Sequence, residues 1–187
     1  MAAARKPVEE KSILWVRWNP AAQAAHDSLE KAIVDFDPGR LAAAQAAARW
    51  LREDGLRGES QPYLAVVDQA IVGFYALTAG QVVLSGHHRK KLGFTFSIQG
   101  AVLITWIAKS AQHELDGGVL MTDAIGMALE VAEKASATVL ALDPYDQATS
   151  DMWKARYAMR VSRTELRTRD GGPALRRLYL PLSAPAV

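Results

Sequence analysis

The sequence predicts an α+β protein built on a mixed, partly parallel central sheet. Three observations carry this prediction. Short apolar runs typical of strands alternate with amphipathic helical patterns along the 187 residues. The run that begins at Ala101 passes a turn ending in Gly117-Gly118 and continues into a long helical pattern, and a second apolar run closes that pattern. The unit Val102–Leu142 should therefore place two strands parallel through a right-handed crossover.

The first half of the chain is expected to supply a strand, two helices and a hairpin. Strand segments are recognised by β-branched and aromatic runs, and helices by apolar residues at one-face spacing. Asp37-Pro38 is the expected start signal of the second helix. The expected elements are strand Ser12–Trp18, helix Ala21–Asp35 with Leu29, Ala32, Ile33 and Phe36 inward, helix Gly39–Glu53 with Leu41, Ala44, Ala48 and Leu51 inward, and strands Tyr63–Val67 and Ile71–Ala79.

The second half is expected to complete the sheet. After Gly118, apolar residues recur at the spacing of one helix face, which predicts a helix to about Lys134. Gln81–Leu84 is expected to continue the strand Ile71–Ala79 or to follow a bend. The other expected elements are a basic loop Ser85–Gly93, a lead Phe94–Ile98 into the central strand, strand Thr138–Leu142, helix Ala148–Met159, and a closing hairpin of Val161–Thr168 and Leu175–Leu182.

Composition favours one domain over residues 12–187, preceded by a loose polar tail at 1–11. Half of the residues are apolar and there is no cysteine, which excludes disulfides and thiolate metal sites. The four histidines show no metal-ligand spacing, so no metal site is expected, and His87-His88 should lie in an exposed loop. No segment reaches membrane-spanning length and no secretory signal is seen, so a cytoplasmic protein is expected.

The basic residues are unevenly distributed. The net charge is +2, but the segment from Lys154 onward carries +6 and the remainder −4. A second basic run covers His87–Lys91. This asymmetry suits a polyanion, although a solvated surface explains any single run. The candidate nucleic-acid-binding residues are Arg89, Lys90, Lys91, Arg156, Arg160 and Arg163.

The turn before the long helix is a candidate anion site. Helix-start N–H groups lack intrahelical partners, and the helix dipole favours negative charge there. Spacing alone favours an ordinary strand–turn–helix connection in which the glycines serve the turn geometry. The rest of the chain favours the anion site.

The order of elements resembles that of the GNAT acyltransferases, and more closely their toxin branch, which is encoded beside ribbon–helix–helix antitoxins. The points of match run in order from Phe36 to the end of the chain. They are FDPGR followed by Trp50-Leu51, AVVDQAIVGFYALTAGQV, AKSAQHELDGGVLMTDAI, ALDPYDQATSDMWKARY and RRLYLPL.

The resemblance implies an N-acetyltransferase that uses acetyl-CoA as co-substrate. Its pyrophosphate would sit on a Q/R-x-x-G-x-G/A loop at the helix start, with Gln112 at the first motif position, Leu115 at the first glycine and Gly117 at the last. The tyrosine that protonates the CoA thiolate in the family falls on Trp153, with Tyr157 one turn on. The implied donor-binding residues are the strand backbone at Trp106, Ile107 and Ala108, and the loop Gln112, His113, Glu114, Leu115, Asp116, Gly117 and Gly118.

Several residues depart from the family pattern. Leu115 replaces a glycine that lets phosphate approach the backbone, and Glu114 and Asp116 place two carboxylates nearby, each opposing an anion by about 1 kcal/mol at ~4 Å in water. Trp153 cannot act as an acid near neutral pH.

Two functions are predicted, and a third is a less favoured alternative. The toxin-like resemblance implies transfer to the amine of an aminoacyl-tRNA, with an antitoxin partner. The alternative is a catalytically weakened GNAT-fold protein that binds RNA, a protein partner or a second copy of itself. An acyltransferase acting on a small amine or a protein lysine is the third.

Overall fold

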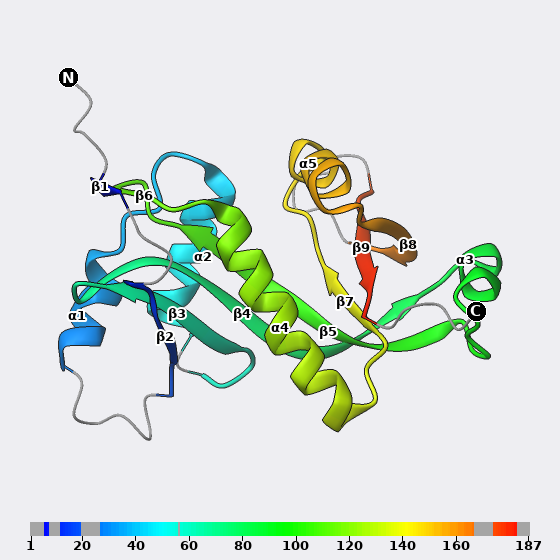
Figure 1. Ribbon diagram of the computed structural model, residues 1–187. Helices are drawn as coiled ribbons and strands as arrows, with labels where there is room; N and C mark the ends of the chain where they lie inside the picture. The colour runs from blue at the N-terminus through cyan, green and yellow to red at the C-terminus, as the bar shows by residue number, and fades with distance from the viewer. Residues whose placement is uncertain (1–5, 8–11, 20–26, 56, 167–173, 183–187) are drawn as a thin grey trace. The chain divides into compact units, whose positions relative to one another are not determined.

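The computed structural model describes residues 6–7, 12–19, 27–55, 57–166 and 174–182 (Figure 1). Helices and strands alternate along these residues, so the predicted α+β class is confirmed. The elements are β1 Lys6–Pro7, β2 Leu14–Arg17, α1 Asp27–Asp35, α2 Ala42–Glu53, β3 Gln61–Val67, β4 Ala70–Val83, α3 Gly86–Lys91, β5 Ile98–Lys109, β6 His113–Glu114, α4 Gly117–Ala135, β7 Val139–Leu142, α5 Gln147–Tyr157, β8 Arg160–Glu165 and β9 Arg176–Pro181.

Seven of the strands pair in the order β2-β3-β4-β5-β7-β9-β8. The sheet is mixed, as predicted: β5 and β7 are parallel, with Ala101 opposite Val139 and Ile104 opposite Leu142, whereas β7–β9 and β8–β9 are antiparallel. This confirms the parallel pairing predicted for the two strands of the unit Val102–Leu142.

The chain forms two compact units, and each is described separately. The first comprises Met1–Thr78 with Thr105–Ala124, and the second comprises Ala79–Ile104 with Ile125–Val187.

In the first unit, helices cover both faces of the β3–β4 hairpin. Leu64 and Phe74 pack in one cluster with α1 and α2, while Ala65 and Val72 pack in another with Leu120 of α4. Alternate residues of a strand point to opposite faces, so a two-sided apolar hairpin needs cover on each side. Aromatic rings complete the first cluster: Phe36 meets Phe74 edge-on with ring centroids 5.6 Å apart.

Gly73 lies where Leu115 and Leu120 approach β4 closely. A Cβ added at this position would lie 2.9 Å from Leu120 Cδ1 and 3.0 Å from Leu115 Cδ2, so the ends of these two leucine side chains would have to shift. The missing side chain therefore lets these two leucines pack directly on the strand.

The second unit has its own core. Side chains from β5, β7 and β9 meet one from the end of β4 and those that directly follow β4 and α3. The buried members of this cluster are Val82, Leu84, Leu92, Ala101, Val139, Ala141 and Tyr179.

Three local predictions need correction. The segment Ser85–Gly93 is not a loop: it contains the helix α3, because Ser85 caps its start by accepting a hydrogen bond from the His88 N–H at 3.1 Å. The helix α2 starts at Ala42 and not at Gly39, since the Asp37 carboxylate instead accepts from the Gly39 N–H at 2.9 Å. Leu41, expected inward, is the N-cap residue and is 75% exposed.

Some predicted boundaries fall outside the described residues. The start expected at Ala21 and the turn of the closing hairpin at 167–173 cannot be compared with the structure. Of the tail expected at 1–11, the structure describes Lys6–Pro7, which form β1 and pair in parallel with β6.

Candidate functional site

The second half of β5 offers an open backbone edge. β7 pairs with β5 only from Ala101 to Ile104, while β5 continues to Lys109. On its other side β5 keeps its neighbour β4, and the Ser110 N–H still donates to the Val72 carbonyl at 2.8 Å. Among the described residues, the stretch 105–109 therefore has one edge without a strand partner, and about every second N–H and C=O along it points outward.

The side chains of this stretch are occupied in packing. Trp106 stacks on Trp50 with ring centroids 5.9 Å apart, and Ala108 is buried in the same cluster. Ile107 packs on the opposite face of the sheet, against the cluster that contains Leu115. Because the three side chains are engaged with the core, what this strand can offer a ligand is its backbone.

Leu115 is a core residue. Its side chain is 2% exposed and packs with Ala65, Val72 and Leu120. The family resemblance implies that Leu115 stands where a glycine would admit a phosphate. Its side chain instead points into the protein, so it anchors the turn to the sheet and does not cover the start of α4.

Asp116 caps α4. Its Oδ1 accepts a hydrogen bond from the Gly118 N–H at 2.9 Å, and its carbonyl accepts from the Val119 N–H at 3.0 Å. A carboxylate at a helix start is stabilised by the free N–H groups and by the dipole. One of the donors expected to bind pyrophosphate therefore already has an anionic partner. Space remains beside it, since a Cβ added at Gly117 would meet no atom within 4 Å.

Lys109 is a site residue that sequence reasoning missed. Its Nζ donates a hydrogen bond to the Leu115 carbonyl at 2.9 Å, so the ammonium group lies against the loop. This positive charge partly offsets the carboxylates of Glu114 and Asp116. The available signal was a lysine at the last position of a strand that leads into a candidate anion loop.

The first part of the loop surrounds a buried hydroxyl. Ser110 is buried, and its Oγ accepts from the Gln112 N–H at 3.1 Å and lies 3.2 Å from His113 Nδ1. The strand β6, His113–Glu114, pairs with β1. A hollow of about 130 Å³ is lined here by Ser110, Gln112, His113 and residues of α1 and the β3–β4 turn.

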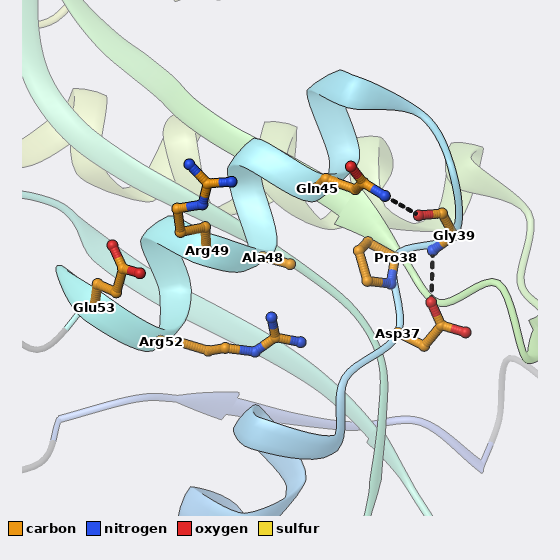
Figure 2. Close-up of a pocket in the computed structure, with 8 residues that line it drawn as sticks. All are labelled: Asp37, Pro38, Gly39, Gln45, Ala48, Arg49, Arg52 and Glu53. Carbon is orange, nitrogen blue, oxygen red and sulfur yellow. Dashed lines mark hydrogen bonds between the residues drawn. The ribbon is translucent and has the colours of Figure 1, made fainter.

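A larger pocket, which the sequence did not predict, lies against α2 (Figure 2). It encloses about 350 Å³ and is lined by Asp37, Pro38, Gly39, Gln45, Ala48, Arg49, Arg52 and Glu53. Arg52 is structural, because its Nη2 donates to the Phe36 carbonyl at 2.6 Å. The pocket adjoins the loop Gln112–Gly118, which is the candidate acetyl-CoA-binding loop (the donor loop), since the Ala111 N–H donates to the Asp37 carbonyl at 2.8 Å. Its lining carries charges of both signs.

Trp153 and Tyr157 lie together on α5 in the second unit. Their ring centroids are 5.2 Å apart, and the Arg156 guanidinium lies 5.5 Å from the Tyr157 ring centre. Trp153 is 8% exposed, whereas Tyr157 is half-buried. Trp153 therefore packs in the core, and Tyr157 carries the more accessible polar group.

The position of both rings depends on the start of α5. Asp146 is its N-cap: Oδ1 accepts from the Thr149 N–H at 2.7 Å and also from the Thr149 hydroxyl. These hydrogen bonds lower the pKa of Asp146 below its ordinary value.

We expect Asp146→Ala to lower the free energy of unfolding by about 1 kcal/mol at neutral pH, whereas Asp146→Asn keeps most of the cap. Because the folded-state pKa is lowered, the contribution is complete above the unfolded pKa and is lost as the pH falls through the folded one. Urea denaturation at pH 7 and pH 3 measures both effects. An equal loss in the alanine variant at the two pH values would contradict the role of the charged cap.

The predicted basic residues divide by role. Arg89 is structural, because its Nη1 donates to the Thr95 carbonyl at 2.7 Å and so holds the turn after α3. Arg160 pairs across the sheet with Tyr179. Lys90, Lys91 and Arg163 are exposed.

The described residues offer neither a metal site nor a membrane-spanning helix. Within them, no group of three or more His, Asp or Glu side chains is arranged to hold a metal ion. No helix in that part of the chain is long and apolar enough to cross a membrane.

Comparison with known proteins finds similarity through structure. No protein-family model and no curated protein matches the sequence. A tyrosine-to-phenylalanine variant of the toxin KacT matches with a TM-score of 0.66 and 15% identity, over 91% of this chain and 95% of KacT. AtaT complexed with acetyl-methionyl-tRNAfMet matches with a TM-score of 0.60 and 13% identity, over 80% of this chain and 86% of AtaT.

A third structure is a tyrosine-to-phenylalanine variant of AtaT bound to the C-terminus of the antitoxin AtaR and to acetyl-CoA. It has a TM-score of 0.62 and 12% identity, over 91% of this chain and 94% of that one. The likeness extends over most of both chains, although few residues are identical. The chain therefore has the GNAT fold of these toxin acetyltransferases.

Proposed function

We propose that the protein is an acetyl-CoA-dependent N-acyltransferase whose acceptor is the amine of an aminoacyl-tRNA. The observation that carries the proposal is the open edge of β5 at 105–109, which leads through the loop into the start of α4. An extended backbone edge can pair with the amide groups of a pantetheine arm, and a helix start can take its pyrophosphate.

The donor side of the reaction would use backbone groups of the first unit. An outward N–H of the stretch 105–109 would bind the thioester carbonyl and stabilise its negative charge as the acceptor amine adds. Lys109 would add positive charge to the loop beside the pyrophosphate, where Gln112 through Gly118 provide the remaining contacts.

The C–N bond forms when the amine adds to the thioester carbonyl. Collapse of the adduct then restores the carbonyl, breaks the C–S bond and releases the CoA thiolate, which takes up a proton. The amine nitrogen loses one proton, which passes to solvent water, and the acid that protonated the thiolate regains its proton from water. We assign the donation to Tyr157, since a phenol can protonate a thiolate and the Trp153 indole cannot.

The acceptor is proposed from charge and from the neighbours. The second unit contains the exposed basic side chains of α3 and β8. Their positive charges suit the phosphate backbone of a nucleic acid. AtaT has been solved with acetyl-methionyl-tRNAfMet and with AtaR. We extend both kinds of partner to this chain: an aminoacyl-tRNA and an antitoxin of the ribbon–helix–helix type. A second copy of the chain is a further proposed partner. The proposed location is the cytoplasm, because these partner molecules are found there.

Acetyl-CoA is expected to bind the full chain and raise its melting temperature. At a free concentration of 100 times Kd, binding stabilises a protein by about 2.7 kcal/mol. Calorimetric titration with acetyl-CoA, and with CoA for comparison, should give a Kd in the micromolar range, corresponding to about −8 kcal/mol. No heat and no shift at millimolar acetyl-CoA would contradict the proposed donor.

Asp116→Asn sharpens this test. The amide oxygen can still cap α4 while the negative charge beside the loop is removed, so we expect acetyl-CoA to bind about fivefold more tightly. Glu59→Gln, an exposed change in the same unit, is the matched control and should leave the affinity unchanged.

The Asp116 cap also favours a second candidate function, a GNAT-fold protein that binds RNA or protein with weak or absent acyl transfer. A helix start that already holds its own carboxylate has less affinity to offer a pyrophosphate. RNA binding in the absence of any acetyl-CoA binding would favour this candidate over the enzyme.

A further inference from the structure

Three buried polar atoms in the second unit lack hydrogen-bond partners. They are His88 Nδ1, Arg160 Nη1 and the Tyr179 hydroxyl, and within the described residues the fourth such atom, Trp18 Nε1, belongs to the other unit. A buried donor or acceptor that finds no partner costs about 1–3 kcal/mol. Three of them in one place therefore need a physical explanation.

The three residues form one contiguous cluster. Arg160 of β8 lies directly opposite Tyr179 of β9 in the strand pairing. The His88 ring, from α3, meets the Tyr179 ring at 62° with centroids 5.9 Å apart. Tyr179 is 0% exposed. Two strands and a helix thus meet at the buried Tyr179 side chain.

The chemistry of the cluster suits an anion. A guanidinium and a phenol can each donate a hydrogen bond, and an imidazole donates from Nδ1 in one tautomer and in its charged form. Three donors can be satisfied together by a ligand with acceptor oxygens. Because the cluster carries excess positive charge, a negatively charged ligand is favoured. The charged and titratable groups that face His88 are His87 and Lys91 on its own helix, Arg160 from β8 and Tyr179 from β9.

We propose that His88, Arg160 and Tyr179 form a phosphate-binding site that takes a backbone phosphate of RNA, with uptake of a proton by His88. The proposal deepens the RNA partner named above and so rests in part on the proposed function. The site itself needs no acyl donor, and its test uses none.

The electrostatics of the free protein explain the proton uptake. Burial, and then the positive charges of Arg160, His87 and Lys91, lower the pKa of His88 below its ordinary value of 6.5. Burial raises the pKa of Tyr179, and Arg160 partly opposes that rise. A bound phosphate would offset the positive charges and accept from the imidazolium. The pKa of His88 would then rise, so binding would consume a proton and tighten as the pH falls through neutrality.

The experiment is a calorimetric titration of the full chain with inorganic phosphate and, separately, with a single-stranded RNA oligonucleotide. Each titration is run at pH 6 and pH 8, and at each pH in two buffers of different ionisation enthalpy, which reports the protons taken up. We expect RNA to bind on the order of tenfold more tightly at pH 6 than at pH 8, with proton uptake. Inorganic phosphate should show the same preference more weakly, because it lacks the rest of the polymer.

Variants identify the residues responsible. His88→Gln should abolish the extra proton uptake with both probes. Inorganic phosphate itself also exchanges protons, but this contribution is the same for the variant and the natural protein and cancels in the comparison. Arg160→Gln should weaken binding about tenfold or more. Arg163→Gln, which removes an equal charge from an exposed position of the same strand, is the matched control and should weaken it about twofold.

Three results would overturn the proposal. One is unchanged proton uptake in His88→Gln, and another is an equal loss of affinity in Arg160→Gln and Arg163→Gln. The third is that inorganic phosphate binds but the RNA oligonucleotide does not, which would exclude RNA as the ligand. If Arg160→Gln does not fold, Tyr179→Phe keeps the ring packing and removes only the hydroxyl, and unchanged RNA affinity in that variant would equally overturn the site. Acetyl-CoA binding is unaffected by these outcomes, so failure here is distinct from failure of the proposed enzyme.

Discussion

Replacing Leu115 with glycine is expected to destabilise the protein by about 3–5 kcal/mol, and not to repair the donor loop. The side chain is buried among Ala65, Val72 and Leu120, and removal of a buried leucine leaves a cavity whose cost adds to the lost burial. Glycine adds a backbone-entropy penalty of about 0.5–1 kcal/mol. Urea denaturation at 25 °C, followed by far-ultraviolet circular dichroism, measures the change as a shift of the midpoint at constant slope.

Leu115→Met is the matched control. It nearly conserves the volume and should cost less than about 1.5 kcal/mol. The glycine variant should also show no gain in acetyl-CoA affinity, since the leucine does not cover the start of α4. A glycine variant within about 1 kcal/mol of the natural protein that binds acetyl-CoA more tightly would reverse this conclusion, and the family-like interpretation of the loop would hold instead.

The sequence predicted most of the fold because the strongest periodic patterns coincide with the longest elements. The helix expected after Gly118 became α4, and the apolar runs on either side became the parallel pair β5–β7. Buried strands and an amphipathic helix are specified locally, through residue type and spacing. The crossover then follows from the handedness of the connection.

The candidate site was less predictable because it depends on burial and capping. An alignment can place Leu115 in a loop, but only the approach of α4 to Gly73 shows that its side chain packs in the core. Asp116 was interpreted as a repulsive charge, although an aspartate just before a helix start is also a typical cap. The sequence therefore contained the signal for a cap, and the structure shows Asp116 in that role.

Clusters formed by distant residues were not visible at all. His88, Arg160 and Tyr179 come from three elements, and the helix that carries His88 was expected to be a loop. The short α3 has no apolar periodicity of its own, so the Ser85 cap was the only local indication. Such sites arise from topology and cannot be found by scanning for motifs.

Tyr157→Phe is expected to lower kcat for acetyl transfer about 100-fold with little change in KM. The proposed chemistry requires a proton for the CoA thiolate, and a positioned acid contributes about 10²–10⁴-fold. Of the two neighbouring rings on α5, only that of Tyr157 carries an acidic group. The measurement is steady-state transfer from acetyl-CoA to an aminoacyl-tRNA. Tyr145→Phe makes the same chemical change at an exposed position of the same unit and should retain the natural rate.

The leaving group separates protonation from positioning. A thioester of a more acidic thiol needs less help in departing, so the Tyr157→Phe variant should recover most of its rate with such a donor, while the natural protein gains little. If the variant is equally slow with both donors, the Tyr157 hydroxyl positions the site through a hydrogen bond and does not protonate the thiolate. If its rate with acetyl-CoA is unchanged, the proton comes from solvent, and α5 serves only as scaffold. The Tyr157 assignment therefore depends on a rate loss that the acidic thiol reverses.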